Sequence, residues 1–377
     1  MIYQNFAHLI TAPVNVPANF LGLRSTKRSN GNVSAGQPFK YSAISNLGSN
    51  RYTDANVWDF GELLVKTINP SSGVFYWDVF DRLLGQNPGK DLFFLLGFPA
   101  DYLVAGNVVA GSCPFGGLAN YCPTGASLTT YASVCAAIAA RAKNNFGITG
   151  AKWCLWGEVD TAADYYEQNP AGWDKLATSA KAVNQAIKAV DPTAVIVAPS
   201  TSTGAPYIMN DFLTASDGAG GTGRDWVSAI AFDPYQDGLT TSYVDGISRG
   251  NFRDGLKEAK SRVDRVLGFV PTAVGMPMYI PETGIKSHSP NGSRDWTRRI
   301  IGFAALGVKQ LHGFATDETN EGYDMRPFIS GWNKAYDILQ GGGVTINSLV
   351  YERELDYNEW NGIARAYVTV NGTQYEI

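Results

Sequence analysis

Two short apolar runs, far apart in the chain, each end on a single glutamate. Residues 151–160 read AKWCLWGEVD and carry Glu158, and residues 276–284 read MPMYIPETG and carry Glu282. Runs of this length and composition are typical of strands in a parallel sheet that is covered on both faces. Because the ends of such strands hold side chains in fixed positions, we expect the two carboxylates to lie at one edge of the sheet.

Strand and helix patterns alternate along most of the chain. Apolar runs predict strands within residues 19–24, 51–58, 91–97, 151–160, 194–199, 226–232, 278–281 and 311–316. Apolar positions three and four residues apart predict helices over 75–84, 131–146, 173–190, 252–267, 296–307 and 327–339. Eight strand candidates with helices between them favour an α/β fold of the closed (β/α)8 type, a TIM barrel, over an open doubly wound sheet. No glycine-rich phosphate motif follows the first strand, which argues against a dinucleotide-binding fold.

The last part of the chain has a different pattern. Three glycines at 341–343 predict a flexible break, and residues 349–355 and 363–370 alternate as antiparallel strands do. We therefore expect a barrel over residues 1–340 and a small antiparallel β appendage over residues 344–377.

Composition narrows the classes of function. The chain has 377 residues, of which 45% are hydrophobic, and can bury a large core. Its formal net charge of -4 comes from 30 basic and 34 acidic residues without runs, so the basic surface expected of a nucleic-acid binder is missing. No apolar run has the length of a membrane span, and residues 1–10 lack the pattern of a secretion signal. We expect a soluble protein with no nucleic-acid partner and no membrane span; the compartment, secreted or cytoplasmic, and the oligomeric state stay open.

Cysteine and histidine usage argues against metal chemistry. Cys113 and Cys122 lie in a loop rich in glycine and proline, where a disulfide and two free thiols are both open, whereas Cys135 and Cys154 in apolar runs are expected to be core thiols. The three histidines form no zinc motif, and no GxSxG nucleophile elbow is present. Lys152 opens its strand at the wrong end for Schiff-base chemistry. We expect no metal and no organic cofactor.

Paired carboxyl groups at one sheet edge suit the hydrolysis of a glycosidic bond. One carboxylic acid protonates the leaving oxygen, and one carboxylate lies on the opposite face of the sugar. A single glutamate at a strand end is more often a solvent-facing residue, but two at corresponding places, beside Gly157 and Gly284, favour a functional pair. A separation of about 5–5.5 Å would give retention of configuration, and about 6.5–9.5 Å inversion.

The motifs around both glutamates resemble those of a known group of enzymes. LWGEVD resembles the strand-four motif of clan A glycoside hydrolases, and YIPETG resembles their strand-seven motif. The order of units, including NRYTDANVWDF and INPSSGVFYWDVFDRL, is most similar to family 39, which contains β-xylosidases, α-iduronidases and exopolysaccharide-cleaving enzymes. The resemblance covers roughly residues 20–340. It implies that Glu158 is the general acid/base, that Glu282 is the nucleophile and that Tyr235 hydrogen-bonds the nucleophile.

Two departures from the family pattern affect the choice of substrate. Gly157 stands where the clan usually has an asparagine that holds the sugar 2-hydroxyl, and residues 315–317 replace the tryptophan that commonly forms the floor of the subsite. Arg51 is a candidate for positioning a substrate group or bracing a glutamate. Trp156 and Tyr165 are candidates for stacking on a sugar ring, whereas Trp173 fits a helix face and is expected in the core.

The sequence thus predicts a retaining glycoside hydrolase that cleaves an O-glycosidic bond in an oligo- or polysaccharide by double displacement. The alternative is a carbohydrate-binding barrel with weak or no turnover, and Gly157 is the reason for keeping it.

Overall fold

The protein is described here by a computed structural model of the chain. It describes residues 6–23, 75, 77, 80–81, 84, 91–96, 123–155, 157, 172–202, 206–234, 243–244, 247–248, 255–284, 292–313, 319–320, 323–324, 326–353 and 363–377.

Parallel strands form the centre of the molecule. One sheet has the order β3 (Leu21–Leu23), β12 (Val308–Gly313), β11 (Met278–Thr283), β8 (Ile230–Asp233) and β7 (Thr201–Ser202), and a second has the order β4 (Phe93–Leu95), β5 (Lys152–Cys154) and β6 (Val195–Val197). A parallel bridge from Val197 to Ala229 joins β6 to the start of β8. The combined order β3, β12, β11, β8, β6, β5, β4 is the order in which strands follow one another around a (β/α)8 ring.

The described strands establish a mixed α/β fold with parallel strands, and closure into a ring stays a prediction. The strand expected over residues 51–58, which would stand between β3 and β4, lies outside the described residues. Seven of the eight expected strands are present among the described residues.

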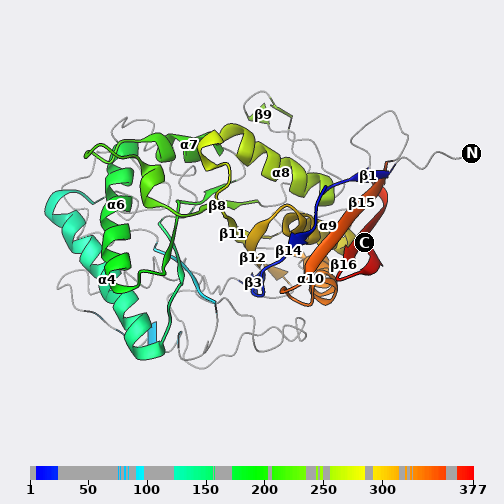
Figure 1. The fold of residues 1–377 in the computed structure, drawn as a ribbon, viewed down its shortest axis with the longest axis horizontal. Coiled ribbons are helices and arrows are strands. Elements are labelled where there is room, and N and C mark those ends of the chain that lie inside the picture. The colour runs from blue at the N-terminus through cyan, green and yellow to red at the C-terminus, as the bar shows by residue number, and fades with distance from the viewer. Residues whose placement is uncertain are drawn as a thin grey trace, which may run out of the picture.

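Helices lie along these strands at the left, top and right of Figure 1. They are α4 (Gly125–Phe146), α6 (Gly172–Val190), α7 (Pro206–Thr214), α8 (Gly255–Phe269), α9 (Gly292–Ala305) and α10 (Arg326–Leu339). In α6 the buried residues Leu176, Ala180, Val183 and Ile187 recur at three- and four-residue spacing, which is why this segment forms a helix with one face on the core. Short elements complete the described chain: η3 (Gly223–Trp226), η4 (Pro271–Ala273), β9 (Tyr243–Val244), β10 (Ile247–Ser248), β13 (Thr319–Asn320) and β14 (Tyr323–Asp324).

Side chains from opposite strands meet between them. The Phe93 ring on β4 lies 5.7 Å from the Tyr279 ring of β11 and 5.3 Å from the His312 ring of β12. Phe94, on the other face of β4, stacks on Trp153 at 4.2 Å. Because β4 stands at one end of the strand order and β12 near the other, these contacts show that the inner faces of the strands pack against each other.

Charged and polar side chains close the same interior at the N-terminal ends of the strands. Asp91, just before β4, forms an ion pair with Lys152 of β5 and accepts a hydrogen bond of 2.8 Å from Gln310 of β12. Tyr279 belongs to this layer, and burial together with the charge of Asp91 raises its pKa to about 12. The layer therefore neutralises its charge through contacts between its own side chains.

A separate antiparallel sheet joins residues from both ends of the described chain. β15 (Thr345–Arg353), β16 (Ile363–Val370) and β17 (Thr373–Glu376) follow one another, and β1 (Phe6–His8) and β2 (Val14–Asn15) both pair with β15. This sheet lies at the right of Figure 1, beyond α9 and α10. The two strands expected within 349–355 and 363–370 are therefore present, but the sheet also takes in N-terminal strands that the sequence pattern did not predict.

The three glycines at 341–343, where the sequence predicted a flexible break, form a turn that packs against residues 16–18. Their φ angles are 72°, 124° and 73°. The Gly343 amide donates to Val16 O at 3.0 Å, and a Cβ on Gly342 would lie 2.1 Å from Pro17 O. Only glycine allows the chain to pass this close to residues 16–18 with such φ angles.

Two strand boundaries also differ from the prediction. The strand expected at 226–232 begins at Ile230, because residues 223–226 form a 3-10 helix that is capped by Thr222 and Asp225. The strand expected at 311–316 begins earlier, at Val308; its described part reaches Gly313, and residues 314–316 lie outside the described residues. Helix α7 had no counterpart in the prediction.

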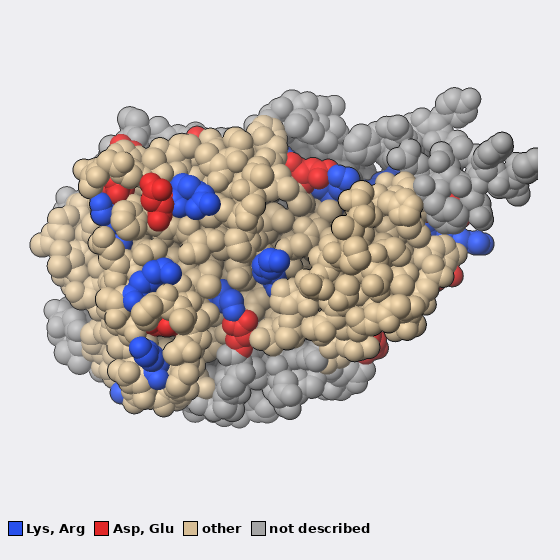
Figure 2. All heavy atoms as spheres, in the orientation of Figure 1, with Lys and Arg blue, Asp and Glu red and all other residues tan. Residues whose placement is uncertain are grey.

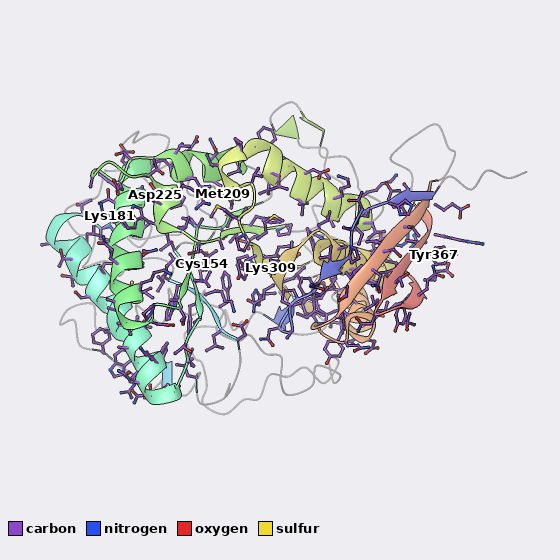
Figure 3. All side chains as sticks on the ribbon, in the orientation of Figure 1. Cys154, Lys181, Met209, Asp225, Lys309 and Tyr367 are labelled. Carbon is purple, nitrogen blue, oxygen red and sulfur yellow. The ribbon has the colours of Figure 1, made fainter. Side chains whose placement is uncertain are left out.

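Cys135 and Cys154 are buried thiols of the core, as expected, and Figure 3 shows Cys154 among the central strands. Cys113 and Cys122 lie outside the described residues. Trp173 is partly buried against the core, in agreement with its predicted place on a helix face. Among the helices that the structure describes, none combines the length and the apolar character needed to cross a membrane.

Candidate functional site

The structure describes one of the six residues that the sequence assigned to the site. Glu282 lies on β11. The others, Arg51, Trp156, Glu158, Tyr165 and Tyr235, lie outside the described residues. Three of their chain neighbours are described, however: Leu155 and Gly157 follow β5, and Pro234 follows β8. Trp156, Glu158 and Tyr235 therefore come in the sequence directly beside residues at the C-terminal ends of parallel strands.

Glu282 sits within β11, at an irregularity in its pairing with β12. Ile280 pairs with Leu311 and Thr283 pairs with Gly313, so β11 takes three steps where β12 takes two. One extra residue in a strand is a bulge, which turns the local side chains away from strict alternation and is common beside active sites. Pro281, which has no amide hydrogen, is suited to this position. The Glu282 side chain at this bulge is buried, with 6% of its surface exposed.

The carbonyl oxygen of Pro234 receives two side chains beside this bulge. The last paired residues of β8 and β11 are Ala231 and Tyr279. Farther along, the Thr283 hydroxyl donates a hydrogen bond to Pro234 O at 2.8 Å, and the Arg299 guanidinium of α9 donates to the same oxygen. The end of β8 is thus tied to β11 by side chains after their backbone pairing has ended.

Arg299 is a buried cation with four described contacts, one of which places its guanidinium carbon 5.8 Å from the centre of the Phe303 ring. Besides Pro234 O, its Nη1 lies 3.5 Å from Glu258 Oε1 of α8, and its guanidinium carbon lies 4.7 Å from the centre of the Trp296 ring. Its exposed fraction is 1%. Glu258 also lies 3.9 Å from Arg262 of the same helix. A cation at this depth requires such partners, because an uncompensated buried charge is strongly destabilising.

Asp233, the last residue of β8, is a second buried carboxylate at this edge. Its Oδ2 accepts a hydrogen bond of 2.6 Å from the Ser200 hydroxyl, which comes just before β7. Phe232 meets Phe303 of α9 edge to face, so Phe232 points toward the helices and alternation places Asp233 on the inner face of β8. Asp233 was not among the site residues predicted from the sequence. Its signal was a polar side chain directly after a buried strand.

His312 holds the backbone on the β12 side of the bulge. Its Nδ1 lies 3.1 Å from Ile280 O, and since a carbonyl oxygen only accepts, Nδ1 carries the hydrogen. Burial lowers the pKa of His312 to about 4, partly offset by this hydrogen bond. The ring is therefore neutral near pH 7 and acts as a donor to the backbone.

Among the described residues, no three or more histidine, cysteine, aspartate and glutamate side chains are grouped as metal ligands. The described part of the site consists of two buried carboxylates on neighbouring parallel strands, with side chains that fix the backbone around them. Such an arrangement can supply a fixed nucleophile or a proton acceptor.

Comparisons with known proteins agree with the fold. No family model matches the sequence, and the comparison with curated proteins finds no match. The fold is similar to that of a monomeric β-xylosidase from Caulobacter crescentus CB15, with a TM-score of 0.52 and 15% identity over 95% of this chain and 74% of that chain.

A GH39 β-xylosidase from Caulobacter crescentus gives a TM-score of 0.50 and 15% identity over 96% of this chain and 79% of that chain. A GH86 protein crystallised with neoagarooctaose gives 0.52 and 12% over 96% of this chain and 65% of that chain. At these identities the likeness concerns the fold. The chain is therefore similar in fold to GH39 β-xylosidases, the branch that its sequence motifs resemble.

Proposed function

We propose that this protein is a retaining glycoside hydrolase whose nucleophile is Glu282. The observation that carries the proposal is a buried glutamate in a bulge, at the C-terminal end of a parallel strand, in a fold similar to that of β-xylosidases. The C-terminal ends of the strands are where barrel enzymes place their active sites.

The proposal includes a closed (β/α)8 barrel over residues 1–340 and a small β unit over residues 344–377. The order of the seven described strands supports the ring. In that order β8 and β6 separate β11 from β5, after which Glu158 follows in the sequence. Two carboxyl groups in these places face the same mouth of a barrel and can approach a sugar from opposite sides.

The proposed reaction has two steps. The Glu282 carboxylate attacks the anomeric carbon while Glu158 gives its proton to the leaving oxygen, and a glycosyl ester forms on Glu282. Glu158, now ionised, then takes a proton from water, whose oxygen attacks the anomeric carbon and releases Glu282. The reaction requires no metal and no organic cofactor. Tyr235 is proposed to hydrogen-bond Glu282, and Arg51, Trp156 and Tyr165 to position the sugar.

The proposed substrate is a β-linked or equatorial glycoside within an oligo- or polysaccharide. A neutral carbohydrate suits the charge distribution: in Figure 2, basic and acidic side chains are interspersed over the described surface on view, rather than gathered in a field of one sign. Such a surface gives no support to a polyanionic partner such as nucleic acid.

Gly157 is the observation that favours the alternative, a carbohydrate-binding barrel with weak or no turnover. A Cβ at Gly157 would come within 3.0 Å of Leu95 Cδ2. The space beside Gly157 is thus already filled by the buried Leu95 side chain. In the proposed enzyme, any contact with the sugar 2-hydroxyl comes from a residue other than residue 157.

The test is incubation with a panel of aryl glycosides and polysaccharides, using wild type, Glu282→Gln and the control Glu376→Gln, which changes an exposed glutamate of the terminal sheet. Cleavage by wild type and the control, lost in Glu282→Gln, supports the enzyme. The anomeric configuration of the first product, read by NMR, tests retention. Binding without cleavage in all three proteins supports the alternative, and neither binding nor cleavage contradicts both.

A further inference from the structure

We propose that Arg299 is a positioning residue that sets the direction of Glu282 by holding the end of β8 against the bulge of β11. This inference deepens the proposed function and rests on it. Arg299 belongs to α9, outside the strands, and was not suggested by any motif around the glutamates.

The bulge must be fixed on both sides for Glu282 to have one orientation. On the β12 side, the backbone pairing resumes at Thr283 and Gly313, and His312 Nδ1 holds Ile280 O just before the extra residue. On the β8 side, the backbone pairing ends earlier, at Ala231 and Tyr279. The described link beyond that point is the Pro234 carbonyl, which joins Thr283 to Arg299.

Two donors on one carbonyl oxygen define the plane of its peptide. A carbonyl oxygen has two lone pairs, and here the Thr283 hydroxyl and the Arg299 guanidinium each approach it. This peptide also contains the amide nitrogen of Tyr235, the proposed partner of Glu282. The Pro234 carbonyl therefore links Thr283, the residue after Glu282, to the peptide that leads into Tyr235.

The guanidinium can act as a rigid anchor because it is itself held. Glu258 lies on one side of it and the Trp296 ring on another, and the whole side chain is buried. A guanidinium presents several N–H groups in a fixed plane, whereas a lysine ammonium is a single point on a flexible stem. We therefore expect lysine at position 299 to keep the charge and lose the fixed geometry.

The chain offers a matched control one residue away. Arg298 lies on the same helix and is equally buried, with 1% of its surface exposed for each arginine. Its Nε donates to Ile377 O, at the end of the terminal sheet, at 2.7 Å. Arg298→Lys thus disturbs an equally buried arginine whose described contact lies in another part of the molecule.

The experiment compares wild type, Arg299→Lys and Arg298→Lys in the full chain. We measure thermal unfolding, kcat and KM on the best glycoside, and hydrogen exchange of the peptide covering residues 278–284. Because a misplacement of about 1 Å can cost about 100-fold in rate, we expect kcat of Arg299→Lys to fall roughly 10- to 100-fold. KM should change less than about threefold, since the ground-state contacts to the sugar remain. Exchange in 278–284 should become faster.

We expect Arg298→Lys to lower the unfolding temperature by a similar amount and to leave both kcat and the exchange of 278–284 near wild type. Equal losses of kcat in the two variants, or unchanged exchange in Arg299→Lys, would overturn the positioning role. Should Arg299→Lys not fold, Glu258→Gln, which weakens the anchor of the same guanidinium, carries the same expectations. If wild type cleaves no glycoside, the proposed function fails, and the exchange measurement still decides the positioning claim.

Discussion

The two ends of the parallel strands bury polar side chains in different ways. At the N-terminal ends, Asp91 meets Lys152 and Gln310, side chain to side chain. At the C-terminal ends, besides the side-chain pair of Ser200 and Asp233, Thr283 and Arg299 both bind a backbone carbonyl. The first arrangement neutralises charge and closes the interior, whereas the second fixes the path of the chain around Glu282. Changes at the first end should therefore act on stability, and changes at the second on activity.

Glu282→Gln should give the largest effect, a large loss of activity with little change in stability. The amide cannot form the glycosyl ester, so we expect kcat to fall by about 10⁴-fold or more, the scale seen when a catalytic side chain is removed. Steady-state kinetics measure the loss of activity, and thermal unfolding of the same sample measures the change in stability. A variant that kept its activity would place the nucleophile elsewhere.

The pH dependence of stability should show the protonation of His312, whose ring is buried and hydrogen-bonds Ile280 O just before the bulge. In the folded protein burial lowers the pKa of His312 to about 4, from 6.5. Because the unfolded chain binds a proton at higher pH than the folded one, the stability is fully present above pH 6.5 and is lost as pH falls toward 4. The loss should be on the order of 3 kcal/mol.

His312→Asn should flatten the stability curve between pH 6.5 and 4, measured by urea unfolding at several pH values. An identical slope in wild type and variant would contradict the burial of a neutral imidazole. Asp217 serves as an internal reference, because hydrogen bonds from Ala219 and Lys181 lower its pKa and its contribution is lost only at more acidic pH.

Asp91→Asn changes the N-terminal ends of the strands and should lower stability rather than activity. It leaves Lys152 without its carboxylate in a partly buried place, and we expect a loss of about 2 kcal/mol in the free energy of unfolding. The control is Asp264→Asn, which breaks the exposed pair with Lys260 and should cost less than about 0.5 kcal/mol. A large fall in kcat for Asp91→Asn at 25 °C would contradict the claim that changes at the N-terminal ends act on stability and not on activity.

Thr283→Val should give the smallest of these effects, and the effect should be on activity rather than on stability. It removes one donor to Pro234 O while keeping the shape of the side chain, so kcat should fall about 5- to 10-fold, the value of roughly one hydrogen bond. Thr283→Ser keeps the hydroxyl and should stay within about twofold of wild type. Equal kinetics for the valine and serine variants would contradict a role of this hydrogen bond in activity.

Sequence periodicity predicted the long helices that bury an apolar face, but it missed the short helix α7, although that helix buries Phe212 and Leu213, and it missed strands that depend on distant partners. Helices α4 and α6 were predicted because their apolar residues repeat regularly. The start of β12 was missed because Lys309 and Gln310 are polar, although Gln310 faces the interior to meet Asp91. β1 and β2 were missed because their partner, β15, lies at the other end of the chain.

The same limit applies to the candidate site. Glu282 was visible because a carboxylate at the end of an apolar run is conspicuous. Its bulge depends on the register of two neighbouring strands, which no local pattern encodes. Arg299 was hidden because an arginine in an amphipathic helix is usually a surface residue, and here its contacts with α8 and with the end of β8 depend on tertiary packing.

The pairing of β1 with β15 fixes an order of events during synthesis of the chain. Phe6 has its partner in Glu352, so the ribosome must add roughly 340 further residues before the two can meet. At about 5–20 residues per second this takes on the order of 20–70 s. The first strands must wait through translation of every parallel strand, and during that time a chaperone or a second nascent chain could occupy them.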